Sequence, residues 1–320
     1  MTFISIDNGI LYLVYTNEQR SLIFYNLIDN KKMNEIKNPH EYIIDNIRYF
    51  FDKINNRDII LSLCYGNLKI WNINLECILN INDIMLMSAC IFNNINQSNI
   101  IYIINKTKPI YMIMKVYNLN GNLDREINLV PEFDLTDLPS KEFIDCYYDT
   151  QSSKNYILLC NTSTSFSFDY NNQKIYRKYK ENFDSNYNQE RNIIIKVEQN
   201  SVKLIESIRE GRINIWDFHS GNFLKTIYII NNFKNDFFIY DKFSIYGICL
   251  WKENYLFIWC SNFMIKLVDL NEGKIVYKFK THVSSVSIKV INHPKFGECL
   301  ISQDDLGGGI QLWDIKKKFN

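Results

Sequence analysis

The stretch THVSSVSIKVINHPKFGECLISQDDLGGGIQLWDI, residues 281–315, decides the fold. It holds three short apolar runs, at 286–291, 299–301 and 310–315, with turn-forming residues between them. Short runs of β-branched and apolar residues separated by Gly, Pro, Asn and Asp are typical of antiparallel β-sheet. Because none of these runs has helical spacing, the stretch predicts one unit of an all-β structure.

The closing residues of this unit recur along the whole chain. In each copy an anchor residue, aromatic in all copies but one, is followed by Asn or Asp. The anchors of the seven copies are Tyr25, Trp71, Tyr117, Phe168, Trp216, Val268 and Trp313. They lie 45 to 52 residues apart. A period of about 45 residues, with four strands in each unit, is typical of a β-propeller.

The strands that carry the anchors are apolar on both faces. The residue three positions before the anchor is apolar in six of the seven copies, and it shares a face with the residue just before the anchor. The anchor itself points to the other face. A strand with two apolar faces must be covered on both, as in blades that stack side by side. We therefore expect an all-β, seven-bladed β-propeller of four-stranded antiparallel blades.

We expect one domain over residues 1–320, with blades at about 1–38, 39–83, 84–143, 144–192, 193–243, 244–281 and 282–320. The last blade is expected to be incomplete, because the N-terminal strand is already needed as the first strand of the first blade. After Trp313 the sequence shows no apolar alternation and carries Lys316, Lys317 and Lys318. An exposed strand edge is either protected by charge or paired with a partner.

Residues 217–227 and 269–279 resemble the end of a WD40 repeat, and Leu312, Trp313 and Asp314 match its closing Trp-Asp. The resemblance covers the whole chain, although only the last third is specific. It implies a divergent member of the WD-repeat β-propellers. It also implies a buried hydrogen-bonded network, which would be structural rather than catalytic. The matching positions are His282, Ser302, Asp305 and Trp313.

Composition limits the other functional classes. The chain has 36 Lys+Arg and 35 Asp+Glu, so its net charge of +1 creates no global field for nucleic acid or an anionic membrane. We expect an intracellular, cytoplasmic protein, because residues 1–15 do not resemble a signal peptide and no apolar run reaches the about 20 residues of a membrane span. The eight cysteines form no C-x-x-C pair, which favours reduced buried thiols over a disulfide framework or a zinc site.

Three long connections, 128–141, 180–192 and 228–244, are candidate binding loops. The first and third carry apolar residues among polar ones and are candidate protein-binding surfaces; alternatively, the first is a spacer and the third an extra strand packed on the propeller. Their candidate binding residues are Phe133, Leu135, Leu138, Phe233, Phe237, Phe238 and Tyr240.

No motif for catalysis stands out. None of the four histidines has a second ligand at metal spacing, and no phosphate-binding loop or nucleophile elbow is present. We expect no enzymatic activity, no cofactor and no bound metal. The leading hypothesis is a non-catalytic scaffold that docks segments of partner proteins, within a multi-subunit complex, on the channel face through its long loops. The alternatives are a propeller that binds nucleic acid or anionic lipid through lysines, and a propeller enzyme with carboxylates along its channel.

Overall fold

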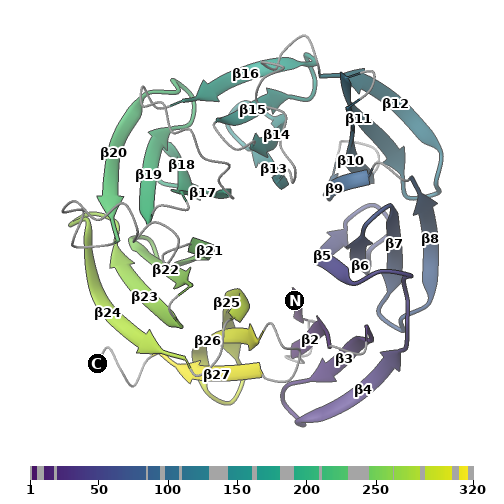
Figure 1. Cartoon of the computed structure of the whole chain (residues 1–320), viewed down its shortest axis with the longest axis horizontal. Helices are drawn as coiled ribbons and strands as arrows, with labels where there is room; N and C mark the ends of the chain where they lie inside the picture. Colours follow the sequence, from purple (N-terminus) through teal and green to yellow (C-terminus); the bar gives the residue numbers. More distant parts are fainter. Residues whose placement is uncertain are drawn as a thin grey trace. The chain divides into compact units, whose positions relative to one another are not determined.

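The computed structural model describes residues 2–5, 11–17, 20–83, 86–93, 98–107, 110–129, 143–160, 164–180, 191–208, 211–229, 245–261, 263–281, 285–304 and 310–315. These residues form 27 β-strands and no helix (Figure 1). Within this part of the chain there is thus no helix long and apolar enough to cross a membrane.

The strands form seven antiparallel sheets, each built from consecutive strands in chain order, which we call blades one to seven. The chain divides into two compact units, residues 1–159 with 168–175 and residues 160–167 with 176–320. The first unit holds blades one to three. Their strands are β1 (Thr2–Ser5), β2 (Leu11–Thr16), β3 (Leu22–Asn26), β4 (Lys31–Ile36); β5 (Ile44–Asp52), β6 (Arg57–Cys64), β7 (Asn67–Asn72), β8 (Cys77–Asn82); β9 (Leu86–Asn93), β10 (Ser98–Thr107), β11 (Ile110–Asn118) and β12 (Leu123–Asn128).

The second unit holds blades five to seven, and the boundary between the units falls within blade four. Blade four contains β13 (Phe143–Asp149), β14 (Lys154–Cys160), β15 (Ser165–Asp169) and β16 (Lys174–Tyr179). The later strands are β17 (Arg191–Val197), β18 (Val202–Ile208), β19 (Arg212–Asp217), β20 (Phe223–Tyr228); β21 (Ile245–Trp251), β22 (Tyr255–Cys260), β23 (Met264–Asp269), β24 (Lys274–Lys280); β25 (Ser285–His293), β26 (Gly297–Asp304) and β27 (Ile310–Asp314).

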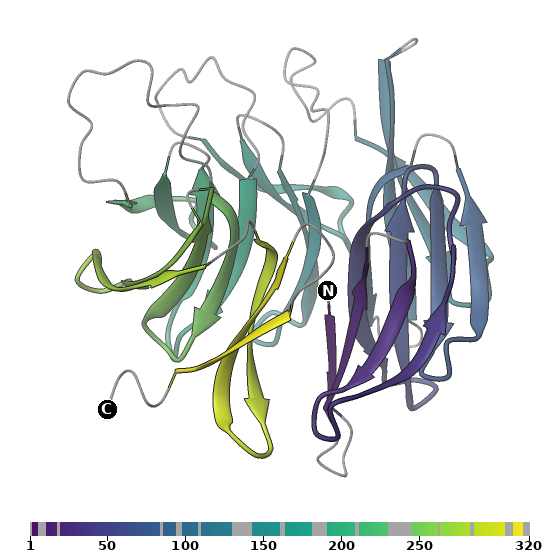
Figure 2. The same ribbon diagram turned by 60° about the horizontal axis from the view of Figure 1, so that its bottom comes forward.

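The predicted all-β blade construction is confirmed. Six sheets have four strands, and blade seven has three among the described residues, β25, β26 and β27. The N-terminal strand β1 is the first strand of blade one and pairs with β2, as expected. Figure 2 shows the strands of the first unit, purple to blue, running side by side with no helix between them. That all blades belong to one domain stays a prediction.

The recurring Asn or Asp after each anchor closes the turn between the third and fourth strands. In six of the seven blades its side-chain Oδ1 accepts backbone N–H groups of that turn at 2.8 to 3.1 Å. A short amide or carboxylate side chain closes a tight turn in this way. The six residues are Asn26, Asn72, Asn118, Asp169, Asp217 and Asp269. The repeated motif is therefore a turn cap.

The same hairpins share a bulge and a left-handed residue. In five blades the register between the third and fourth strands shifts just before the anchor, for example between Ile70 and Trp71. Asn30, Gly121, Gly221 and Gly273, in the turns that follow the anchors, have positive φ, which Gly and Asn adopt most easily. In blade four Gln173 takes this conformation. Because Asp169 caps that turn as its counterparts do, Phe168 lies in the same register as the other anchors.

The anchor strands of blades two and six bury their two faces against different neighbours. In the first unit, Leu68 and Ile70 of blade two pack with Leu86 and Ile100 of blade three. The anchor of blade two, Trp71, packs the other way, against apolar residues of blade one. The second unit repeats the arrangement, with blade five packed on blade six and blade six on blade seven. The prediction of two covered faces is confirmed within each unit.

The turn cap can be tested at Asn118. Replacing Asn118 with Ala removes the acceptor for the N–H groups of Asn120 and Asn122, each 3.0 Å away. We expect the free energy of unfolding, measured with urea, to fall by about 1–2 kcal/mol. Asn118→Asp keeps the Oδ1 acceptor and should stay within about 0.5 kcal/mol of the original protein. An equal loss in both variants would contradict the capping role.

A second test addresses the anchor Trp216, which is 3% exposed. Trp216→Ala leaves a cavity in the core and should lower the free energy of unfolding by about 3–5 kcal/mol. Trp313 is only half-buried, so Trp313→Ala should cost less. Denaturant unfolding of both variants checks this order. A loss below about 1 kcal/mol for Trp216→Ala would indicate a surface-like site.

Candidate functional site

Because neighbouring strands of a blade are antiparallel, the connections between strands emerge on two opposite faces. First and third strands run in one direction, and second and fourth strands run in the other. The segment that joins a fourth strand to the next first strand therefore emerges on the same side as the turn between second and third strands. We call this side the connection face. The turns between first and second strands, and between third and fourth strands, lie on the opposite face.

A groove of about 1270 Å³ opens on the connection face between blades one and two. Its walls include Arg20 from the second turn of blade one and residues 38–42, which join β4 to β5. Tyr65 and Asn67 come from the second turn of blade two, and Asn82 ends β8. All of these residues belong to the first unit. The groove therefore combines a connection between two blades with turns from both.

A buried hydrogen-bond chain holds the floor of this groove. Trp71 Nε1–H donates to Ser62 Oγ at 2.7 Å, and Ser62 Oγ lies 2.7 Å from His40 Nε2. His40 Nδ1 lies 3.2 Å from Cys64 Sγ, and the Cys64 thiol donates to the carbonyl of Tyr65 at 3.6 Å. Every donor has an acceptor if Ser62 donates to Nε2 and Nδ1–H donates to sulfur, so this tautomer fits the chain.

The imidazole of His40 is kept neutral by its surroundings. Burial, with the positive charge of Lys69 nearby, lowers the pKa of His40 from 6.5 to about 4, and a hydrogen bond with Asn67 offsets part of the change. Burial likewise raises the pKa of the Cys64 thiol. A neutral ring that both donates and accepts is what the chain requires, so charge and geometry agree.

Apolar side chains stand exposed beside the groove. Tyr42, Ile43 and Tyr65 are 54%, 67% and 56% exposed, and the rings of Tyr42 and Tyr65 meet edge to face with centroids 5.8 Å apart. The segment that carries Tyr42 and Ile43 is held by contacts to its backbone. Arg20 Nη1 donates to the carbonyl of Glu41 at 2.8 Å, and Lys69 Nζ donates to the carbonyl of Pro39. Tyr42 is therefore presented by a well-anchored segment.

Other blades use the same position for the acceptor of the anchor Trp. In blade five, Trp216 Nε1–H donates to Glu206 Oε2 at 3.0 Å, and Ser165 Oγ–H donates to Glu206 Oε1 at 2.6 Å. In blade seven, Trp313 Nε1–H donates to Ser302 Oγ at 3.3 Å. Ser62, Glu206 and Ser302 each lie two residues beyond the partner of the Trp in the register. The network position is thus repeated, with a buried carboxylate in one blade.

The predicted site residues are placed unevenly. Ser302 and Trp313 lie together, whereas His282 and Asp305 fall outside the described residues, so the network of blade seven stays a prediction. The candidate binding residues Phe133, Leu135, Leu138, Phe233, Phe237, Phe238 and Tyr240 also lie outside the described residues. Of the seven anchors, Trp71, Phe168, Trp216 and Val268 are buried, and Tyr25, Tyr117 and Trp313 are half-buried.

Sequence analysis missed His40 and Glu206. The signal for His40 was its spacing, because it precedes Trp71 by 31 residues, as His282 precedes Trp313. Asn38 and Pro39 stand before it instead of the Gly that the resemblance leads one to seek. Nothing in the sequence marked Glu206, because a carboxylate inside an apolar run shows its burial only in the fold.

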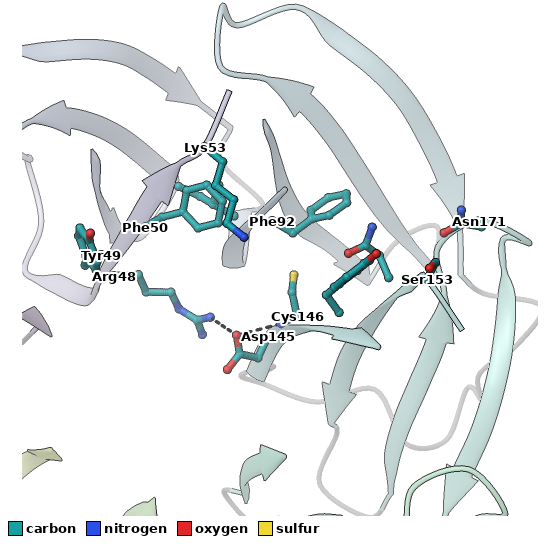
Figure 3. Close-up of a pocket in the computed structure, with 12 residues that line it drawn as sticks. Arg48, Tyr49, Phe50, Lys53, Phe92, Asp145, Cys146, Ser153 and Asn171 are labelled. Atoms are coloured by element: carbon teal, nitrogen blue, oxygen red, sulfur yellow. Dashed lines mark hydrogen bonds and ion pairs between the residues drawn. The ribbon is translucent and has the colours of Figure 1, made fainter. Parts of the chain in front are cut away.

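A second pocket, of about 550 Å³, lies toward the opposite face of the first unit (Figure 3). Strands β5, β9 and β13 converge on it and contribute Phe50, Phe92 and Cys146. Arg48 Nη1 lies 3.1 Å from Asp145 Oδ1 and so links blade two to blade four. The described residues contain no group of three or more His, Cys, Asp or Glu placed to hold a metal ion.

Comparison with known proteins yields a likeness of fold. No protein-family model and no curated protein matches this chain. Solved structures do match, among them a chain from the crystal structure of BBS1N in complex with ARL6DN, soaked with lead. It aligns with 99% of this chain and 92% of its own length, with a TM-score of 0.67 and 9% identity. The fold is a seven-bladed β-propeller. In total 1315 solved chains match, and a fold so widely shared selects no single function.

The pKa of His40 gives a test of the buried chain. In the unfolded protein the His40 ring is protonated below about pH 6.5, whereas in the folded protein it is protonated only below about pH 4. The contribution of His40 to stability is therefore present above pH 6.5 and is lost as the pH falls from there to 4. We expect denaturant midpoints to fall across this window, and less steeply in His40→Gln. His219→Gln serves as the control, and a His40 pKa near 6.5 by NMR would contradict the network.

Proposed function

We propose that this chain is a non-catalytic docking propeller of WD40-like construction. It binds an extended segment of a partner protein on the connection face. The observation that carries the proposal is the groove between blades one and two, where Tyr42, Ile43 and Tyr65 stand exposed beside a wall held by buried hydrogen bonds. The matching solved structure holds BBS1N together with a second protein, which is consistent with a propeller that binds proteins.

The physical case is one of pre-organisation. Binding costs conformational entropy at loops and side chains, and a segment already held in place loses less of it. Contacts from Arg20 and Lys69 hold the backbone of Glu41 and Pro39 before any partner arrives. Tyrosines that are apolar on the ring and polar at the tip are enriched at protein interfaces. The groove thus offers aromatic anchors at low entropic cost, with asparagines around them for hydrogen bonds.

The chain Trp71–Ser62–His40 supports the WD40-like part of the proposal, because it contains three of the four residue types that the resemblance implies, in one blade. The predicted binding residues in 130–142 and 230–244 belong to the same kind of connection as Tyr42, since these segments join β12 to β13 and β20 to β21. They remain candidate binding residues.

We further propose that the seven blades act as one domain in the cytoplasm. All eight cysteines are free thiols, and this cysteine usage is typical of proteins in reducing compartments.

The experiment is affinity capture with the whole chain as bait, read by quantitative mass spectrometry. Three baits are compared: the original chain, the double variant Tyr42→Ala/Tyr65→Ala, and Tyr246→Ala. Tyr246 is 43% exposed on β21, outside the groove and the candidate binding loops, so it is a matched control for loss of an exposed tyrosine. We expect proteins retained by the original chain and by Tyr246→Ala to be lost about tenfold or more with the double variant, as for a loss of about 1.4 kcal/mol.

Thermal unfolding of the three baits must agree within a few degrees, so that loss of capture reflects the surface. Equal retention by all three baits would overturn the groove as the docking site. Binding of the purified partner is then measured at two salt concentrations. A steep fall of the binding constant with increasing salt concentration would favour the alternative, in which lysines bind a polyanion.

A further inference from the structure

We propose that Cys90 and Cys146 are a redox-modifiable thiol pair, which a peroxide converts to a disulfide between blades three and four. Their sulfur atoms lie 2.9 Å apart. A disulfide bond is about 2.04 Å long, so less than about 1 Å of movement separates the two thiols from bonding distance. This inference is independent of the docking proposal, because it concerns a different site of the first unit.

The two cysteines belong to different sheets. Cys90 lies on β9, where it is paired with Ile101 of β10, and Cys146 lies on β13 of blade four. Strands β9 and β13 pack against each other without backbone pairing in one sheet. A bond between the two sulfurs would therefore tie neighbouring blades covalently. It would close a loop of 56 residues, long enough for a substantial loss of chain entropy in the unfolded state.

The two thiols differ in their exposure to solvent, and this difference determines which of them reacts first with the oxidant. Cys146 is half-buried and lines the 550 Å³ pocket, beside Asp145 and across from Arg48 (Figure 3). Cys90 is 1% exposed and lies behind it. A small oxidant that enters the pocket meets Cys146 first. Cys90 is then placed to resolve the oxidised sulfur.

The chemistry balances with hydrogen peroxide as the oxidant. The Cys146 thiolate attacks one peroxide oxygen, the O–O bond breaks, and hydroxide leaves, giving Cys146 sulfenic acid. The Cys90 sulfur then attacks the Cys146 sulfur, the S–O bond breaks, and water leaves after the Cys90 proton is transferred. The two thiols have lost two protons and two electrons in all, and one peroxide has become two waters.

The surroundings make this reaction slow rather than fast. Burial raises the pKa of the Cys146 thiol well above its usual value, with further increases from the contact with Cys90 and from Asp145, while Arg48 lowers it. Because the thiolate is the nucleophile, little reactive sulfur is present at neutral pH. We therefore expect the pair to be thiols at rest and to respond to sustained oxidant.

The test treats the folded chain with hydrogen peroxide, alkylates the remaining thiols, and maps the peptides by mass spectrometry. We expect a Cys90–Cys146 linked peptide, a protein mass lower by two hydrogens before alkylation, and a midpoint of thermal unfolding higher by about 4 °C. A reductant should reverse all three changes. Cys77, which is exposed and donates a hydrogen bond to the carbonyl of Leu79, is the internal reference. It should form sulfenic acid or overoxidised products without an internal disulfide.

The variants Cys146→Ser and Cys90→Ala separate the roles of the two thiols. Without Cys146 no cross-link should form, and Cys90 should stay reduced. Without Cys90, Cys146 should stop at sulfenic acid, which a dimedone-type probe traps. Far-ultraviolet circular dichroism shows whether both variants are folded. The proposal fails if peroxide leaves both thiols alkylatable in the folded chain, or if it takes Cys146 to sulfinic acid while Cys90 is intact.

Discussion

The structure depends on one constraint, the burial of two apolar faces by anchor strands such as β7 and β23. A single sheet in water can hide only one face, so a strand such as β7, with Leu68, Ile70 and Trp71 all buried, requires a sheet on either side. In the first unit blade two meets blade three through one face and blade one through the other. Neighbouring blades in each unit therefore stack face to face, because each blade buries an apolar face of the next.

In blade two, the polar groups that enter this apolar stack form hydrogen bonds with one another. The Trp indole N–H of the anchor needs an acceptor, and the fold supplies it from a fixed position on the second strand, Ser62, Glu206 or Ser302. A buried network of this kind rigidifies its surroundings when each member is satisfied. In blade two the network reaches His40 and so extends from the core to the connection face. The wall of the groove between blades one and two is held by that chain.

The same stacking that buries the core brings together side chains that are distant in sequence. Arg48 of blade two forms an ion pair with Asp145 of blade four. The sulfur atoms of Cys90 in blade three and Cys146 in blade four lie 2.9 Å apart. Such contacts between the first strands are where a ligand or a chemical modification can act on more than one blade at once. The interfaces between blades of the first unit thus gather reactive groups that are far apart in the sequence.

The sequence by itself determined the repeat, the seven anchors and the type of strand. The period of about 45 residues and the apolar pattern are local properties, and the turn after each anchor is closed by the very next residue, so no distant contact was needed to foresee it. Phe168 was found from its aromatic-Asp pair together with its spacing, and Asp169 caps the turn that follows it as its counterparts do.

The tertiary structure decided which polar residues are joined. His40 and Ser62 are 22 residues apart, and Ser165 and Glu206 are 41 apart, so their pairing depends on which blades stack and in what register. The burial of Glu206 and the approach of Cys90 to Cys146 depend on the same packing. A one-dimensional pattern indicates that a face is buried, but only packing in space determines what it is buried against.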